Sequence, residues 1–280
     1  MKFKEIEQLY LEGLVGQYDL NEVKGIFSLV VESICGWSIN QINIHIHQEA
    51  SILEYNNLIS ALAELKTGKP VQHVIHAAWF YGKQFEVNAD VLIPRPETEE
   101  LVEWILQSLN TSADLLDIGT GSGCIAITIK SKRADVTVRA MDVSKDALAI
   151  AKRNAALHHT DIEFLQEDVL NYTTEQNFDV IVSNPPYITQ QEKQEMHNHV
   201  LLHEPHLALF VTDENPLIFY KAIADLAMNV LKPEGYLFFE INEYLGREMM
   251  DMLRDRNFTD ILLKKDMQGK DRMIRCKKGT

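Results

Sequence analysis

From Ala113 onward, short apolar runs typical of buried strands alternate with segments of helical periodicity. The predicted strands are 113–118, 136–141, 161–166, 178–183, 235–241, 259–264 and 272–277, and the predicted helices include 123–132, 144–157, 214–231 and 244–256. Such alternation predicts a parallel sheet covered by helices. Only a short polar connection, residues 266–271, joins the last two strands. We therefore expect one antiparallel strand in a mostly parallel, seven-stranded α/β domain.

The first seventy residues carry helix signals instead. Asp19 followed by Glu22 predicts the start of one helix, and Ser51 with Glu54 forms the capping-box pattern of another. The second of these helices is expected to stop at Gly68. We therefore expect a small all-helical N-terminal domain over residues 1–72.

A strand pattern with a tight turn follows in residues 73–94. Two runs rich in aromatic and β-branched residues, 78–81 and 84–87, flank Gly82 and Lys83. This pattern predicts a β-hairpin that links the two domains. The larger domain is then expected to occupy residues 95–280.

The net charge limits the partners of the chain. It is −14, and residues 1–90 and 91–280 are both acidic. Binding to DNA or RNA through the phosphates needs basic surface and is therefore disfavoured. The exception is the basic segment 264–278, which we interpret as the solvated face of the last strand pair.

Cysteine usage and hydropathy favour the cytoplasm. Cys35, Cys124 and Cys276 are odd in number and far apart, as expected for small core residues in a reducing compartment. No apolar stretch reaches the length of a membrane span, and the first residues lack the pattern of a signal peptide. We expect a cytoplasmic monomer that does not bind membranes.

One histidine cluster was weighed as a metal site. His197, His199, His203 and His206 lie close in the sequence with Glu204, but they share no helical register and have no cysteine nearby. The pattern is too loose to predict a ligand set, so no metal is expected.

A glycine-rich turn separates the first strand of the larger domain from a helix. Asp117 begins the spacing Asp-x-Gly-x-Gly-x-Gly that ends at Gly123, and the next strand ends in Asp142 nineteen residues later. Glycines allow a ligand to approach the backbone, and a carboxylate at that point can accept both hydroxyls of a ribose. A dinucleotide fingerprint would need a sixth-position glycine where Cys124 stands. The spacing is instead similar to the S-adenosylmethionine loop of Rossmann-like methyltransferases.

A second motif, Asn184-Pro185-Pro186-Tyr187, directly follows the predicted strand 178–183. Consecutive prolines stiffen the loop and leave its carbonyls without local partners. An asparagine held there offers amide donors and an acceptor at a fixed position, and the tyrosine adds an aromatic face. This combination suits binding of a planar group that carries an NH2.

The chain resembles the N(5)-glutamine methyltransferases that modify peptide chain release factors. The resemblance covers nearly the whole sequence and is carried by Phe80-Tyr81-Gly82 with Phe85 and Val87, by Leu92-Ile93-Pro94-Arg95-Pro96-Glu97-Thr98-Glu99, by the glycine-rich turn, by Asn184-Pro185-Pro186-Tyr187 and by Gly269-Lys270-Asp271-Arg272. The Pro-Arg-Pro-Glu-Thr segment is the specific part, because Asn-Pro-Pro-Tyr also occurs in adenine and ribosomal RNA methyltransferases.

The resemblance implies a Rossmann-like class I methyltransferase domain, a hairpin linker and a helical domain that helps to hold a protein substrate. The substrate would be the glutamine of the Gly-Gly-Gln loop of release factors. Asn184, Pro185 and Tyr187 would be catalytic, and with Pro186 they would bind the substrate amide. S-adenosylmethionine would contact Asp117, Gly119, Thr120, Gly121, Ser122, Gly123, Asp142, Asp168, Val169 and Asn184. At Val169, some relatives place an aromatic residue near the adenine.

Two alternatives remain open at this stage. An adenine-N6 methyltransferase acting on DNA or RNA would present the same NH2 group to the Asn184 loop, although it would need a target-recognition module and basic surface. A non-catalytic binding module would retain the fold as a scaffold. The intact motif residues Asp117, Gly119, Gly121, Asp142 and Asn184 argue against it.

Overall fold

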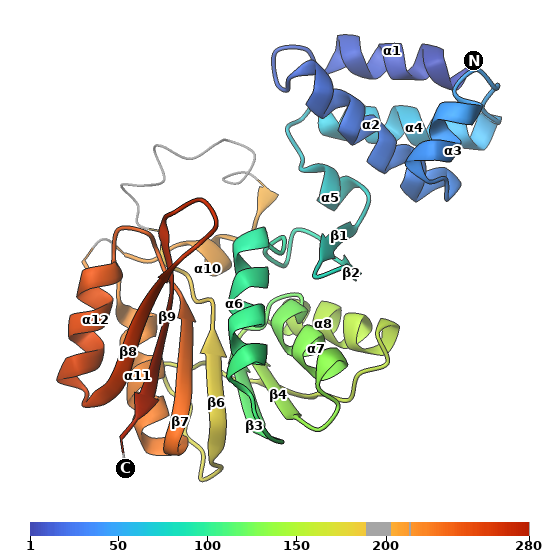
Figure 1. Ribbon diagram of the computed structural model, residues 1–280. Coiled ribbons are helices and arrows are strands. Elements are labelled where there is room, and N and C mark those ends of the chain that lie inside the picture. Colours follow the sequence, from blue (N-terminus) through green and yellow to red (C-terminus); the bar gives the residue numbers. More distant parts are fainter. Residues whose placement is uncertain (189–202, 213, 280) are drawn as a thin grey trace. The chain divides into compact units, whose positions relative to one another are not determined.

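The computed structural model describes residues 1–188, 203–212 and 214–279, which form two compact units (Figure 1). The first unit contains residues 1–77, and the second contains residues 78–188, 204–212 and 214–279. Within the described part of the chain, no helix is long and apolar enough to cross a membrane.

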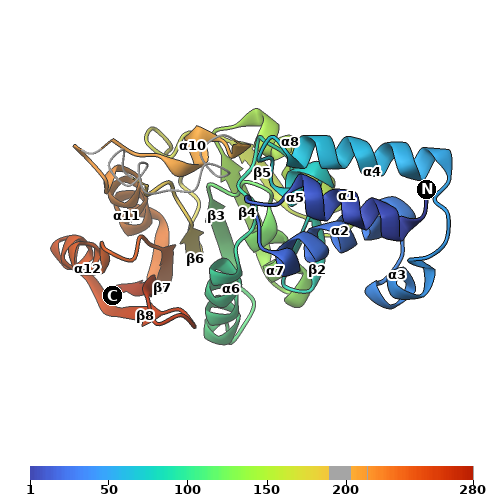
Figure 2. The same cartoon turned by 90° about the horizontal axis from the view of Figure 1, so that it is seen from above.

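The first unit is helical, as predicted. Its helices are α1 (Phe3–Gly13), α2 (Leu20–Cys35), α3 (Ile39–His45), α4 (Ile52–Leu65) and α5 (Val71–Val74). The Asp19 side chain caps α2 by accepting two backbone N–H groups, and Ser51 with Glu54 caps α4, so both predicted helix starts are confirmed. Helices α1, α2 and α4 pack against one another around buried Tyr10, whose hydroxyl donates to the Leu58 carbonyl at 2.6 Å (Figure 2).

The predicted hairpin consists of β1 (Ala77–Phe80) and β2 (Lys83–Glu86). Tyr81 and Gly82 both have positive φ, as a two-residue hairpin turn requires. The fully buried Asn154 of α8 (Lys145–Leu157) accepts the Glu86 N–H at 2.7 Å and donates to the carbonyls of Glu86 and Ser122. The hairpin is therefore fixed to the second unit next to the glycine-rich turn.

A seven-stranded sheet forms the centre of the second unit (Figure 1). Its strand order is β5-β4-β3-β6-β7-β9-β8. The strands are β3 (Asp114–Ile118), β4 (Thr137–Asp142), β5 (Glu163–Gln166), β6 (Phe178–Ser183), β7 (Leu231–Glu240), β8 (Phe258–Lys265) and β9 (Asp271–Lys278). Strand β9 pairs antiparallel with β7 and β8, and the other pairs are parallel, which confirms the predicted sheet.

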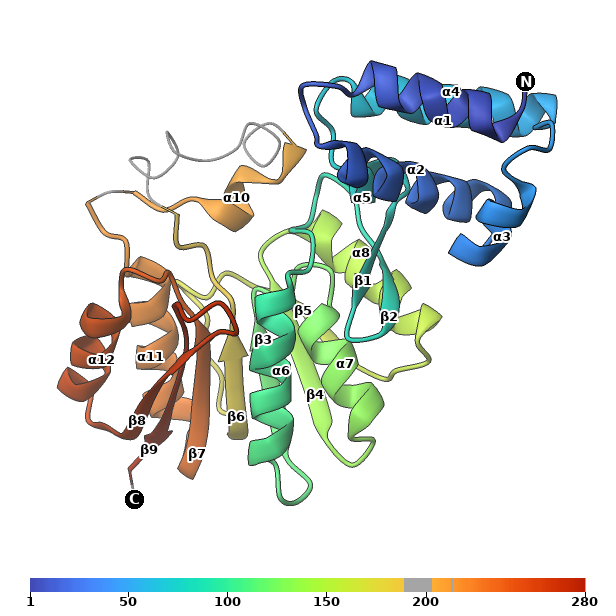
Figure 3. The ribbon, with the colours of Figure 1, turned by 45° about the horizontal axis from the view of Figure 1, so that its top comes forward.

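Helices cover both faces of this sheet (Figures 1 and 3). Because side chains alternate along a strand, Leu115 contributes to the core under α6 (Pro96–Ser108) and α7 (Cys124–Lys132). The next residue, Leu116, contributes to the core under α11 (Ile218–Val230) and α12 (Gly246–Asp255). Burial on both faces explains why the central strands β3 and β6 are mostly apolar in sequence.

The structure differs from the predicted elements mainly at their ends: α11, for example, begins at Ile218, four residues after the predicted start at 214. Strand β7 begins at Leu231, four residues before the predicted start at 235, because Leu231 already pairs with Phe178 ahead of a register shift. The helices α5 and α10 (His206–Leu209) were not predicted. Each has four residues, little more than one turn, so neither leaves a periodic pattern in the sequence.

Candidate active site

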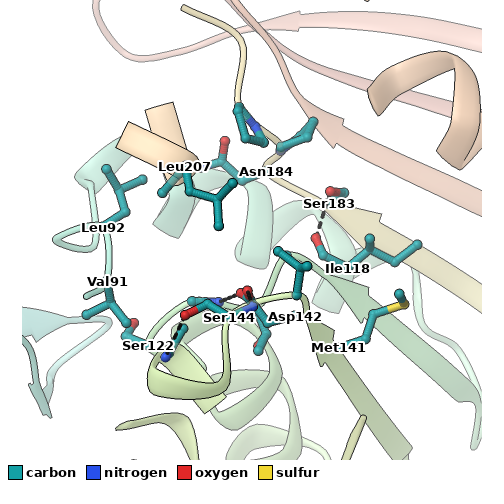
Figure 4. Close-up of a pocket in the computed structure, with 18 of the residues that line it drawn as sticks. Val91, Leu92, Ile118, Ser122, Met141, Asp142, Ser144, Ser183, Asn184 and Leu207 are labelled. Atoms are coloured by element: carbon teal, nitrogen blue, oxygen red, sulfur yellow. Dashed lines mark hydrogen bonds between the residues drawn. The ribbon is translucent and has the colours of Figure 1, made fainter. Parts of the chain in front are cut away.

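A cavity of about 290 Å³ opens at the carboxyl ends of β3, β4, β5 and β6. The segments that follow these strands line it: residues 118–122, 141–144, 167–170 and 183–186. The rest of the lining consists of residues 90–92, 94, 95 and 98, residues 124, 125 and 147, residues 205, 207 and 208, and residues 219 and 223. In the view of Figure 4, Asn184 and Leu207 lie above the cavity and Asp142 and Ser144 lie below it.

The glycine-rich turn places backbone on the cavity surface. Gly119 and Gly121 have φ of 74° and 55°, and no other atom lies within 4 Å of where a Cβ would stand. Positive φ explains why both positions are glycine. A Cβ on Gly123, by contrast, would lie 2.8 Å from the Ile127 side chain, so Gly123 allows close packing of α7.

Asp117 and Gly123 support the turn on the side away from the cavity and are not among the residues that line it. The carboxylate of the fully buried Asp117 accepts the hydroxyl proton of Thr120 at 2.6 Å. Burial raises the pKa of Asp117 to about 7, and the nearby Asp142 adds to the rise. Thr120 and Ser122 do line the cavity.

Asp142 ends β4 and faces the cavity. Its Oδ2 accepts the Gly121 N–H and its Oδ1 accepts the Ser144 N–H, both at 2.9 Å. Burial raises the pKa of Asp142, while these N–H groups oppose the rise. Each oxygen retains acceptor capacity for a ligand hydroxyl. Asp168 and Val169 also line the cavity, in the segment that follows β5.

The Asn184 loop forms the opposite part of the lining. Ser183 ties the end of β6 to β3 by donating its hydroxyl to the Ile118 carbonyl at 2.7 Å. Asn184, Pro185 and Pro186 then reach the cavity. Tyr187 is not among the lining residues, because its ring packs with the core around α11 and α12.

Several polar residues at this site were not predicted as site residues, among them Thr98, which lines the cavity, and its partner Glu240, which does not. Thr98, in the first turn of α6, donates its hydroxyl to Glu240 Oε2 at 2.6 Å and accepts from Asn184 Nδ2 at 3.5 Å. Thr98 and Glu240 are almost fully buried. Burial raises the pKa of Glu240, while the Thr98 hydrogen bond and the charge of Arg272 oppose the rise. A glutamate at the end of an apolar strand was the sequence signal for Glu240.

An ion pair holds the far rim of the cavity. Arg95 Nη2 lies 2.5 Å from Oε1 of the buried Glu204. Arg95 lines the cavity, as do Pro205 and Leu207, which follow Glu204 in the sequence. Burial raises the pKa of Glu204, and Arg95 opposes that rise. The Arg95 side chain of the Pro-Arg-Pro segment therefore fixes the residues that follow Glu204.

The remaining sequence features lie away from the cavity or outside the described residues. His197 and His199 are outside them, and among the residues that are described no group of three His, Cys, Asp or Glu side chains is placed to hold a metal. Cys124 and Cys276 are buried, free core residues, as predicted, and Cys124 is the exception among these features because it also lines the cavity; Cys35 is only half-buried. In the basic segment, Arg275 lies over the rings of Trp104 and Tyr236.

Comparisons with known proteins show which proteins this chain is similar to. Residues 97–214 match the Methyltransferase small domain family. A release factor glutamine methyltransferase of Flavobacterium psychrophilum is 41% identical over 98% of this chain and 99% of its own length. That of Bacteroides thetaiotaomicron is 41% identical over 92% and 93%. A methyltransferase structure from Pyrococcus furiosus covers 81% of this chain and 99% of its own, with a TM-score of 0.54 at 16% identity, and supports the fold alone.

The buried Asp117 predicts a pH dependence of stability. Its pKa is 3.8 in an unfolded chain and about 7 in the folded one, so the folded chain binds the proton more tightly. The free energy of unfolding should therefore fall as pH rises from about 4 to about 7. Asp117→Asn should lack this fall, giving a gap of up to about 4 kcal/mol between the variant and the parent above pH 7. Urea unfolding at pH 5 and pH 8 measures the gap, and parallel pH profiles would contradict the assignment.

Proposed function

The chain belongs to the release factor glutamine methyltransferase family, and we propose that it transfers a methyl group from S-adenosylmethionine to the side-chain nitrogen of a release factor glutamine. The glutamine is that of the Gly-Gly-Gln loop. The observation that carries this proposal is that the Asn184 loop and the glycine-rich turn open onto one cavity. A methyl donor at the turn and an amide at Asn184 would thus be neighbours.

The residues of the cavity fit S-adenosylmethionine. Gly119 and Gly121 leave open space against the backbone where any side chain would project. Asp142 offers acceptors for the ribose hydroxyls, and Asp168 and Val169 lie in the next loop, where they would contact the adenine. When bound, the cofactor supplies an electrophilic methyl group on a sulfonium sulfur.

The Asn184 loop addresses the weak nucleophilicity of the amide. The lone pair of an amide nitrogen is delocalised into its carbonyl. Asn184 Oδ1 and the Pro185 carbonyl can each accept one of the two N–H bonds of the substrate, which orients the lone pair toward the methyl group and favours a pyramidal nitrogen. Such positioning can contribute several kcal/mol to lowering the barrier. The methylated nitrogen is strongly acidic and loses its proton without a dedicated base.

The proposed substrate suggests a role for each of the three parts of the chain. Residues 95–280 carry the catalytic domain, residues 73–94 the linker, and residues 1–72 a helical domain that holds the release factor. The acidic net charge of −14 favours a protein substrate over direct binding of nucleic acid. The three free cysteines fit a cytoplasmic monomer acting beside the translation machinery.

The proposal is tested by mass spectrometry of a purified release factor after incubation with this protein and S-adenosylmethionine carrying a labelled methyl group. One labelled methyl on the glutamine of the Gly-Gly-Gln loop is expected. Adenine-rich DNA and RNA, incubated in parallel, should remain unlabelled. Labelled adenine with an unmodified release factor would support the nucleic acid alternative instead.

Asp142→Ala should weaken binding of S-adenosylmethionine. The loss of hydrogen bonds to a charged acceptor costs roughly 1.5–3 kcal/mol, about ten- to a hundredfold in Kd. Calorimetry measures the change, with the exposed Asp161→Ala as the matched control that leaves affinity unchanged. An unaltered Kd in Asp142→Ala would remove Asp142 from the cofactor site.

Asn184→Ala should affect turnover far more than cofactor affinity, because its acceptor faces the substrate amide. We expect kcat to fall at least about a hundredfold, as for other preorganised polar groups. Asn229→Ala, an exposed asparagine on α11, serves as the control and should keep full turnover. Turnover close to that of the parent in Asn184→Ala would show that the amide is held elsewhere.

The helical unit should matter for a folded substrate. Because the first structural unit ends at Ala77, we would remove residues 1–77 rather than 1–72. The shortened chain should still bind S-adenosylmethionine but should methylate intact release factor much more slowly, since remote contacts help to position the reacting amide. Equal rates for the two chains, or equal rates of the full chain on release factor and on a Gly-Gly-Gln peptide, would exclude a substrate-holding role.

A further inference from the structure

A chain of hydrogen bonds runs from the cavity into the protein interior. Asn184 Nδ2 lies 3.5 Å from Thr98 Oγ1, and Thr98 Oγ1 lies 2.6 Å from Glu240 Oε2. Thr98 and Glu240 are 3% and 2% exposed, so water does not compete for these groups. The three residues come from the loop after β6, the first turn of α6 and the end of β7.

The number of protons available to these three residues decides which group donates and which accepts in each hydrogen bond. A carboxylate can only accept, so the single hydroxyl proton of Thr98 is given to Glu240 over the short contact. The Thr98 oxygen is then left with lone pairs alone and can only accept from Asn184. Turning the Asn184 amide over would place its carbonyl oxygen against an oxygen that has no proton to give, which leaves buried acceptors unpaired.

The surroundings of Glu240 keep it in the role of acceptor. Besides Thr98, the Asn184 side chain itself hydrogen-bonds Glu240, the Tyr187 hydroxyl points at its Oε1 at 3.5 Å, and the positive charge of Arg272 lies nearby. Arg272 is itself held by Asp266 at 3.1 Å. Glu97 is the like charge that faces the group. Burial raises the pKa of Glu240, but its hydrogen-bond donors and the Arg272 cation oppose that rise, so Glu240 remains able to accept from Thr98.

We propose that Thr98 and Glu240 are positioning residues that hold the Asn184 amide with its oxygen toward the cavity. The inference rests on the proposed function, in which the substrate amide has two N–H bonds and needs acceptors. Asn184 turned the other way would present its own N–H groups to the substrate, donor against donor. The buried carboxylate thereby sets, through the Thr98 hydroxyl and through its own contact with the Asn184 amide, which atom of Asn184 the substrate meets.

The test compares Thr98→Ala with Thr98→Ser, since both lose the same methyl group and differ only in the hydroxyl. We expect kcat of Thr98→Ala to lie at least about tenfold below that of Thr98→Ser, with the KM for S-adenosylmethionine unchanged. Thermal unfolding confirms that both variants are folded. If Thr98→Ala does not fold, Thr98→Val is used in its place. Valine has nearly the same shape as threonine but lacks the hydroxyl.

The same pair made in the Asn184→Ala background separates positioning from stability. If the hydroxyl acts through Asn184, the ratio of the two rates falls to about one there, which single-turnover assays with labelled cofactor can measure. A ratio that is the same in both backgrounds, or equal rates in the parent background, would overturn the inference. A parent chain that leaves release factor unmethylated would instead refute the proposed function.

Discussion

The parallel register of β3 with its two neighbours is the constraint on which the site depends. Ile118 pairs with Met141 on one side and with Ser183 on the other. The residues that come next along each strand are Gly119, Asp142 and Asn184, so they emerge side by side at one edge of the sheet. A shift of one residue in either strand pairing would displace Asp142 or Asn184 along the edge of the sheet and turn that side chain to the opposite face.

Three buried hydroxyl groups gather at this edge, and each donates a hydrogen bond to a group of another segment. Ser183 donates to β3, Thr120 donates to Asp117, and Thr98 donates to Glu240. A buried carboxylate is costly unless hydrogen bonds compensate for lost water. The elements that supply the donors are the loops and the helix start that surround the cavity. The polar interior of the site is therefore stable only in the assembled domain.

Much of the fold could be predicted because its signals are local. Strand and helix periodicity, the caps at Asp19 and Ser51 and the hairpin turn at Gly82 all act within a few residues. The cavity lining at Gly119, Asp142 and Asn184 followed from the rule that parallel strands end at a common edge.

The pairing of Thr98 with Glu240 could not be predicted in this way. These residues are 142 positions apart, and although Thr98 belongs to the Pro-Arg-Pro-Glu-Thr segment, nothing in the sequence pairs that segment with Glu240. The sequence also could not predict that Asp117 and Gly123 lie away from the cavity surface. Both belong to the motif, but packing beneath the turn decides which of its members face a ligand. Sequence motifs therefore pointed to the cavity, and tertiary packing decides which motif residues line it.

The three hydrogen bonds of Asn154 have a consequence for how the domain acquires its site during folding. They join the hairpin at Glu86 to the glycine-rich turn at Ser122, across sequence separations of 68 and 32 residues. Contacts between such distant segments form only after the chain between them has closed, which is the slow kind of event in folding. The turn thus gains its final support late, together with the hairpin. A nascent chain would acquire its binding surface as a whole rather than motif by motif.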